Sequence, residues 1–403
     1  MTRNRGKIAL AAAFVLVLAI QILKGLSTEP HLYPLIYSIF SYADGPIRRG
    51  LLPSLFHFAG YQTIDEQARL FAVLHLVCLA GFVALLVKYL RDQPSKPGSL
   101  LFWLRALFLT GVTVPLMAAT NFYGDALLVT GLLATHMLLL RRYRGWAAVL
   151  MLILSLQHEL MMVLALPLWL MHAYQSPDWK RALVPPLAVF GFMAVFLVAA
   201  AENHTRLAVN VESLCIAHRP ANATTPHNGW DENCPYFLSA HMADEAELFR
   251  FVVVGVYLPA MGLFPFLLPL FWHRLSFAHE RRAPAIMRLL LMGLPLGLIL
   301  IAVDIDRIIM LTLCVTWLLL EGARRNGEDA VERGEVVMFA VAVLFQLILY
   351  YPSINYYAQG RFLPPVWSEK LFLSPQNWMV EKFGDDLPPS LKPLYCADPR
   401  CAQ

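Results

Sequence analysis

The chain has 403 residues, and its composition argues against a string of soluble domains. Hydrophobic residues make up 58% of it and charged residues only 15%, which leaves too little polar surface to cover two or three soluble domains. The net charge of +4 needs no nucleic-acid partner to explain it. We therefore expect an all-α polytopic membrane protein, surrounded by membrane lipids and with no nucleic-acid partner.

Apolar stretches long enough to cross a bilayer recur along the chain. No small-residue cleavage site follows the first of them, which favours a retained helix over a signal peptide. We expect about 10–11 transmembrane helices in a domain over residues 1–351, and a short tail at 352–403 outside the membrane. The predicted spans lie at 8–23, 68–87, 101–119, 125–140, 183–201, 251–272, 287–303, 307–321 and 336–351, with one more segment at 145–172.

Segment 145–172 has basic residues at both ends, including Arg144 and Lys180. A single crossing would place one of these clusters outside, against the rule that positive charge stays in the cytoplasm. Two short helices that meet near Gln157-His158-Glu159 return the chain to the inside. This interpretation gives eleven crossings.

The distribution of positive charge predicts the orientation. With a cytoplasmic N-terminus, the inner segments hold 19 Lys and Arg in 67 residues, and the outer segments hold 9 in 151. This asymmetry is typical of the positive-inside rule. The outer segments are then 27–67, 119–124, 202–249, 303–306 and 352–403.

Cysteine placement agrees with that orientation. Cys78 and Cys314 fall within spans and are expected to be small buried residues. The other cysteines lie in outer segments, where an oxidising compartment favours the disulfides Cys215–Cys234 and Cys396–Cys401. Unpaired thiols are the alternative.

Two outer segments have features of their own. Segment 27–67 contains Leu51, Leu52 and Leu55 among aromatic residues, which predicts a short helix in the membrane interface. Segment 202–249 is polar, and its Asn203-His204-Thr205 sequon has a meaning only in a eukaryotic host. We find no internal repeat.

The predicted topology brings polar side chains from distant parts of the chain to the outer face. An ionisable side chain in hydrocarbon costs at least roughly 2.5–3.5 kcal/mol, so such residues are candidates for function. This convergence is the main functional signal in the sequence. The residues are Asp44, Arg48, Arg49, Asn121, Asp125, His158, Glu159, Asp304, Asp306 and Arg307.

Each of these residues also has a simpler interpretation. Asp44 precedes Gly-Pro and could be a turn residue. Arg48 and Arg49 could be interfacial anchors. Asp125 could be the first-turn acid of a helix, and Asp306 with Arg307 could form a local ion pair.

Several common chemistries lack their motifs here. His158-Glu159 has no second histidine for a zinc-protease helix, and no cysteine or histidine cluster has zinc spacing. A P-loop, a dinucleotide fingerprint and a serine elbow are also missing from the sequence. The remaining set suits arginines that hold a phosphate and a carboxylate that accepts a proton.

The sequence resembles the GT-C superfamily of polytopic membrane glycosyltransferases. This resemblance rests on a first span that is followed by an outer loop with an acidic residue and interfacial helices. More narrowly, the chain resembles bacterial inner-membrane proteins associated with surface polysaccharide, at Gly45-Pro46-Ile47-Arg48-Arg49-Gly50-Leu51, His158-Glu159 and Asp304-Ile305-Asp306-Arg307. The resemblance implies transfer of a sugar from a polyprenyl-phosphate-linked donor to a lipid or glycan acceptor at the periplasmic face of the bacterial inner membrane. Asp44 stands alone where many members have paired acids, and no large soluble domain follows the last span.

The resemblance implies that Asp44 corresponds to the acidic residue of the first outer loop. We hypothesise that Asp44 is the general base, with Glu159 or Asp125 as substitute. In the same hypothesis Arg48, Arg49 and Arg307 hold the donor phosphate, and His158 orients Glu159 or protonates the leaving phosphate. No cofactor is expected, and no metal site is indicated, although a divalent metal is compatible. Asn121, Asp304 and Asp306 would support the site. The alternatives are a polysaccharide polymerase, a transporter or flippase for a lipid-linked sugar, and a noncatalytic scaffold.

Overall fold

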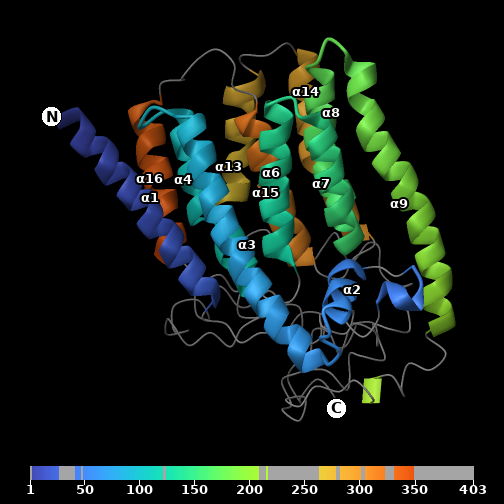
Figure 1. Ribbon diagram of the computed structural model, residues 1–403. Coiled ribbons are helices and arrows are strands. Elements are labelled where there is room, and N and C mark those ends of the chain that lie inside the picture. Colours follow the sequence, from blue (N-terminus) through green and yellow to red (C-terminus); the bar gives the residue numbers. More distant parts are fainter. Residues whose placement is uncertain are drawn as a thin grey trace, which may run out of the picture.

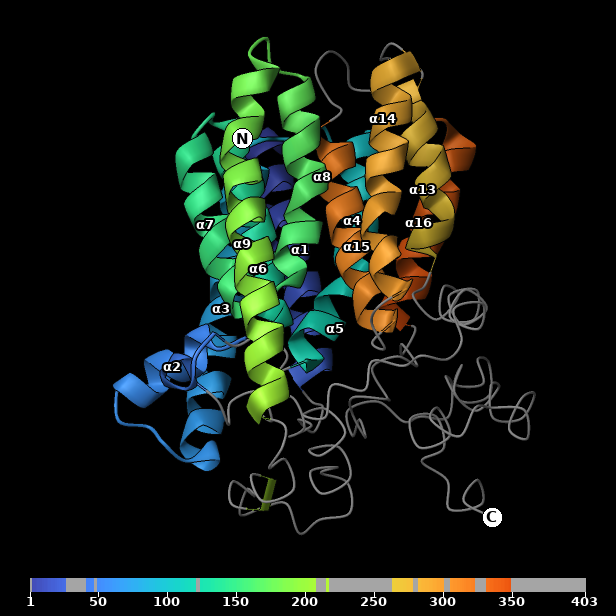
Figure 2. The same ribbon diagram turned by 90° about the vertical axis from the view of Figure 1, so that its right-hand side faces the viewer.

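The structure is a computed structural model that describes residues 2–26, 41–46, 49–120, 124–207, 215–216, 263–277, 282–300, 305–322 and 331–348. This part of the chain is mostly helical and contains no strand. The prediction of an all-α fold is confirmed for it. Figures 1 and 2 show the long helices side by side in a bundle.

The helices follow the order of the predicted spans. They are α1 (Thr2–Leu26), η2 (Tyr42–Asp44), α2 (Leu51–Phe58), α3 (Ile64–Asp92), α4 (Leu100–Thr110), α5 (Thr113–Ala119), α6 (Asp125–Leu140), α7 (Arg144–Gln157), α8 (Leu160–Tyr174), α9 (Trp179–Leu207), α13 (Phe264–Trp272), η4 (His273–Phe277), α14 (Arg282–Gly293), η5 (Leu294–Leu300), α15 (Ile305–Glu321) and α16 (Arg333–Ile348).

The bundle has two different ends. Helices α6, α8 and α15 begin at one end, near Asp125, Glu159 and Arg307, which we call the loop end; α2 also lies there (Figure 1). The same helices finish at the opposite end, near Leu140 and Glu321, which we call the basic end. The sequence analysis predicts that the loop end faces outward.

Three stretches among the described residues are long and apolar enough to cross a membrane: Ile64–Asp92, Leu100–Ala119 and Trp179–Asn203. Helices α6, α7 and α8 have 16, 14 and 15 residues. At a rise of 1.5 Å per residue they are roughly 21–24 Å long, shorter than the roughly 30 Å hydrocarbon layer.

The outer faces of α3 and α9 are apolar. Val77 of α3 is 60% exposed, and Leu187 and Val195 of α9 are 64% and 74% exposed. A helix on the surface of a soluble protein presents polar residues outward instead. Large exposed apolar surfaces mark contact with a membrane or a protein partner.

Helix α15 lies at the centre of the bundle. Every residue from Arg307 to Glu321 is buried, and the helix contacts α4, α5, α6, α8, α13 and α14. Figure 2 shows α13, α14 and α16 on one side of it and α6 to α9 on the other. Its Trp317 stacks on Phe108 of α4, with 4.1 Å between ring centroids.

The predicted span 101–119 is interrupted, which the sequence analysis did not predict. Gly111 separates α4 from α5 and loosens the helical ladder there. Gln21 of α1 donates to the Thr110 carbonyl at 2.7 Å, and Gln346 of α16 donates to the Leu107 carbonyl at 3.1 Å. Side chains of two distant helices therefore satisfy carbonyl groups beside the break.

The prediction that segment 145–172 forms two short helices is confirmed. Helices α7 and α8 are packed against each other and are joined at His158 and Glu159. His158 closes α7 by donating its N–H to the Leu154 carbonyl at 2.8 Å. The predicted short helix in the first outer segment is also present, as α2.

The cysteines agree with the prediction where they are described. Cys78 and Cys314 are buried and free, and Cys215 is disulfide-bonded. The expected partner Cys234 and the other expected pair, Cys396 and Cys401, lie outside the described residues.

The packing of α1 on α5 gives a first prediction. A Cβ atom at Gly25 would overlap the Pro115 carbonyl and the Ala118 Cβ, and backbone cannot yield easily. We expect Gly25→Ala to lower the free energy of unfolding by about 1–3 kcal/mol. Gly191→Ala in α9 is the matched control, because a Cβ there meets nothing within 4 Å.

The control should leave stability unchanged or raise it by up to about 1 kcal/mol, since alanine favours helix over glycine. Thermal unfolding of the detergent-purified protein measures both variants. Equal midpoints for the two variants would contradict the close packing of α1 on α5.

Candidate functional site

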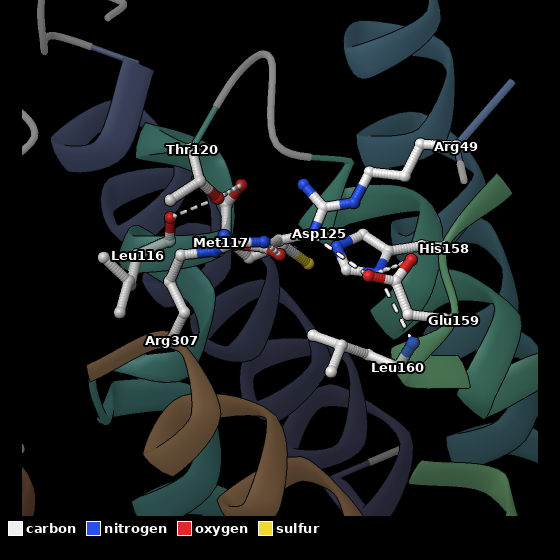
Figure 3. A network of polar contacts seen from close by, with 9 residues as sticks. All are labelled: Arg49, Leu116, Met117, Thr120, Asp125, His158, Glu159, Leu160 and Arg307. Carbon is white, nitrogen blue, oxygen red and sulfur yellow. Dashed lines mark hydrogen bonds and ion pairs between the residues drawn. The ribbon is translucent and has the colours of Figure 1, made fainter. Parts of the chain in front are cut away.

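Four polar side chains from separate elements lie at the loop end (Figure 3). Arg49 precedes α2, and Asp125 is the first residue of α6. Glu159 directly precedes α8, and Arg307 lies in the first turn of α15. The bundle brings them together because α6, α8 and α15 all begin at this end.

Asp125 and Arg307 form a tight buried ion pair. The Arg307 Nε and Nη2 atoms donate to the two carboxylate oxygens of Asp125 at 2.8 and 2.6 Å. The side chains are 0% and 3% exposed. The ion-pair partner of Arg307 is thus 182 residues away in the sequence and joins α15 to α6.

Arg49 and Glu159 form a looser, partly exposed pair. Arg49 Nη2 lies 3.5 Å from Glu159 Oε1, and the side chains are 21% and 20% exposed. This distance is long for a charge-assisted hydrogen bond, which is usually about 2.7–2.9 Å. The pair can therefore open at a smaller energetic cost than the pair of Asp125 and Arg307.

His158 lies against Glu159 and is buried. Its Nδ1 atom is 3.7 Å from Glu159 Oε2, a distance that makes an ion pair only if the imidazole is protonated. The backbone N–H of Leu160 points to the same Nδ1 atom at 3.4 Å, which makes this nitrogen an acceptor.

The backbone of Arg49 is strained. Its φ angle is +59°, in the left-handed region that glycine adopts most easily. The conformation costs about 1–2 kcal/mol for a residue with a Cβ atom. Among the described non-glycine residues, positive φ occurs at Arg49 and Arg142. Such strain often accompanies a side chain that serves a site.

Residues that the sequence analysis did not select as site residues hold η2 and α2 in place. The Leu52 N–H donates to Gln157 Oε1 at 2.8 Å, and the Tyr42 hydroxyl donates to the Leu156 carbonyl at 3.1 Å. Burial raises the pKa of Tyr42 to about 12, so its hydroxyl stays a donor. Asn203 donates to the Asp44 carbonyl at 2.9 Å. The only sequence signals were that Gln157 adjoins His158 and that Asn203 belongs to a sequon.

Asp44 has a local role in the structure. Its carboxylate accepts from the backbone N–H of Ser41 at 2.8 Å and completes a capping box around η2. The residue is exposed. This arrangement agrees with the turn interpretation, and its carboxylate is not part of the network in Figure 3.

Other predicted site residues are only partly described. Arg48, Asn121 and Asp304 lie outside the described residues, and of Asp306 only the backbone is described, in the first turn of α15. In the described part of the chain, no group of three His, Cys, Asp or Glu side chains could hold a metal ion.

Comparison with known proteins adds nothing to this geometry. No family model matches the chain, and no curated protein and no solved structure matches it. The site therefore has to be interpreted from its own residues. It combines a buried, neutralised ion pair with a partly exposed arginine and carboxylate beside a buried histidine.

The buried pair of Asp125 and Arg307 can be tested by its effect on stability. We expect Asp125→Ala to lower the free energy of unfolding by about 3–5 kcal/mol, because Arg307 would be left as a buried charge without its partner. Asp92→Ala is the matched control. It breaks an exposed pair with Arg141 of 2.7 Å, which is worth about 0–1 kcal/mol.

Thermal unfolding in detergent measures both variants. The double variant Asp125→Ala, Arg307→Leu should recover part of the lost stability, because it removes the orphaned charge. A loss no larger than that of the control would show that Asp125 and Arg307 are not a buried pair.

Proposed function

We propose that the chain is a membrane glycosyltransferase of the GT-C type. It would transfer a sugar from a polyprenyl-phosphate-linked donor to a lipid or glycan acceptor at the periplasmic face of the bacterial inner membrane. The observation that carries the proposal is the loose, partly exposed pair of Arg49 and Glu159 beside buried His158. It supplies a phosphate-binding group and a proton acceptor at one place.

The membrane part of the proposal rests on the helix arrangement. The apolar outer faces of α3 and α9 suit lipid, and successive helices alternate between the two ends of the bundle (Figure 1). About 10–11 crossings with a cytoplasmic N-terminus would place the loop end outside. Short helices such as α7 and α8 would not span the whole hydrocarbon layer, so the turn that joins them would lie at membrane depth. Non-helical backbone is tolerated there only where protein or a water-filled cavity surrounds it.

Arg49 is our candidate for the donor phosphate, together with Arg48. A guanidinium group can donate two parallel hydrogen bonds to the oxygens of a phosphate. This interaction is stronger than the 3.5 Å contact of Arg49 with Glu159. Donor binding would thus draw Arg49 away from Glu159. The carboxylate would then be available as a base.

Glu159 is our first candidate for the general base, and Asp44 is the second. The acceptor hydroxyl oxygen would bond to the anomeric carbon while the carbon–oxygen bond to the phosphate breaks. The hydroxyl proton would pass to the carboxylate, and polyprenyl phosphate would leave with the bonding electrons, stabilised by Arg49. We assign Asp125 and Arg307 to positioning α6 and α15 beneath this site, because each already neutralises the other.

One observation favours a second candidate, a transporter for a lipid-linked sugar. The break between α4 and α5 lies within a membrane-length stretch, as in the discontinuous helices of transporters. However, the polar groups there include Gln21, Thr110 and Gln346, which bond to the break or to one another and carry no charge. We therefore prefer the transferase.

The proposal is tested by the release of polyprenyl phosphate from radiolabelled polyprenyl-phosphate hexoses and pentoses. The assay contains the full chain in nanodiscs and a membrane lipid extract as the source of acceptors. We expect Glu159→Gln to reduce the rate about 10²–10⁴-fold and Arg49→Ala about 10²–10³-fold. Arg49→Lys should restore only part of the rate, because lysine lacks the fork.

The matched controls are Arg141→Ala and Asp92→Asn, which change an arginine and a carboxylate in an exposed pair at the basic end. Both should keep the full rate. If Glu159→Gln keeps full activity and Asp44→Asn loses activity, the general base is Asp44 and not Glu159. Donor that crosses the bilayer without release of polyprenyl phosphate would support the transporter and reject the transferase.

A further inference from the structure

A polar cavity lies at the basic end of the bundle, at the opposite end from the candidate site. Its volume is about 190 Å³, and its lining includes Tyr89, Arg105, Arg142, His172 and Glu321. The residues come from five elements that meet there: α3, α4, the end of α6, the end of α8 and the end of α15. Along α15, Glu321 follows Arg307 by 14 residues, or roughly 21 Å of helix.

One wall of the cavity is a tight buried ion pair. Arg105 Nε and Nη2 donate to the two carboxylate oxygens of Glu321 at 2.7 and 2.8 Å, and the side chains are 3% and 1% exposed. The Tyr89 hydroxyl also donates to Glu321, at 3.2 Å. The carboxylate is therefore fully engaged. It contributes little negative charge to the cavity.

Arg142 also lines the cavity, and it is exposed. No ion pair joins it to a carboxylate in the described part of the chain. Counting Arg105, Glu321 and Arg142, the lining has one net positive charge with its histidine neutral. Gln93 and Gln175 add amide donors, and His172 adds an imidazole.

The backbone places Arg142 at the cavity at a cost in strain. The N–H groups of Arg142 and Tyr143 donate to the carbonyls of Leu139 and Leu138, which is the Schellman arrangement that ends many helices. The residue at the position of Arg142 usually is glycine, because φ is positive there, and Arg142 has φ +63°. A positive charge near a helix C-terminus is favoured by the helix dipole, but it does not require a residue with positive φ. We therefore interpret the strained Arg142, which also lines the cavity, as a candidate ligand-binding residue.

Charge around the cavity favours an anion as well. Arg91 lies in the last turn of α3, and Arg144, Lys180 and Arg181 lie in the first turns of α7 and α9, at the basic end. Lys88 also lies near the end of α3, where it pairs with Asp92 at 3.5 Å. Basic residues grouped around a pocket raise the local concentration of anions. Basic pockets between helices are also a common way to hold lipid headgroups.

We propose that this cavity binds a phosphate group, held by the guanidinium of Arg142 with the amides of Gln93 and Gln175 and the imidazole of His172. The phosphate belongs either to the headgroup of an anionic membrane lipid or to a soluble phosphate compound. The shared chemistry is a tetrahedral anion that fits an arginine fork. This site does not depend on the proposed transferase function.

The test uses the full chain in phosphatidylcholine nanodiscs. One arm titrates inorganic phosphate by calorimetry. The other compares discs with and without phosphatidylglycerol, and measures retained phosphatidylglycerol by native mass spectrometry. We expect binding in at least one arm, and the arm that responds identifies the source of the phosphate.

Arg142→Gly is the decisive variant. Glycine fits the backbone at that position, and the substitution removes the side chain with its guanidinium without disturbing the helix end. We expect at least a tenfold loss of affinity together with an unchanged or higher unfolding midpoint. Arg142→Asn is the second variant, since asparagine also tolerates positive φ. Arg141→Ala is the matched control, because this neighbouring arginine does not line the cavity and should keep the affinity.

Three outcomes would overturn the proposal. The wild-type protein could bind neither inorganic phosphate nor phosphatidylglycerol. Both Arg142 variants could bind as tightly as the wild type. Arg141→Ala could lose as much affinity as Arg142→Gly, which would indicate a diffuse charge effect rather than a site.

Discussion

The rest of the structure depends on pairing charges that the bundle buries at both ends of α15. Arg307 near its start is held by Asp125 of α6, and Glu321 at its end is held by Arg105 of α4. A single buried charge costs several kcal/mol, while a well-formed pair recovers much of that cost. A shift of α15 along its axis would separate both pairs at once, so together they fix the register of the central helix against two neighbours.

The same residue types have different uses because their surroundings differ. The two pairs on α15 have short distances and nearly no exposure, and this suits structure. The pair of Arg49 and Glu159 is long and partly exposed, so water and ligands can compete for either partner. Arg142 lies at a cavity, and no ion pair joins it to a carboxylate among the described residues. Tightness and exposure, rather than residue type, separate structural charges from those available for binding.

Much of the fold could be predicted from local pattern, and much of the pairing could not. The bounds of α6 and the division of 145–172 follow from hydropathy and from basic flanks, which are properties of neighbouring residues. The break at Gly111 was missed because its support comes from Gln21 and Gln346, on helices far apart in sequence. Asp125 and Arg307 were both selected, but their attachment to each other depends on a register that no short segment contains. The cavity at the basic end was missed for the same reason: its residues lie in segments that, taken singly, look like ordinary basic loops.

The left-handed backbone at Arg49 and Arg142 has a consequence for protein engineering. One way to stabilise such a chain, for instance for crystallisation, is to relieve backbone strain by placing glycine at these two positions. We expect such a variant to keep every helix. It would also lack one guanidinium at each end of the bundle. A variant selected by melting temperature alone could thus lose the binding that we propose for both ends of the bundle while its fold stays unchanged.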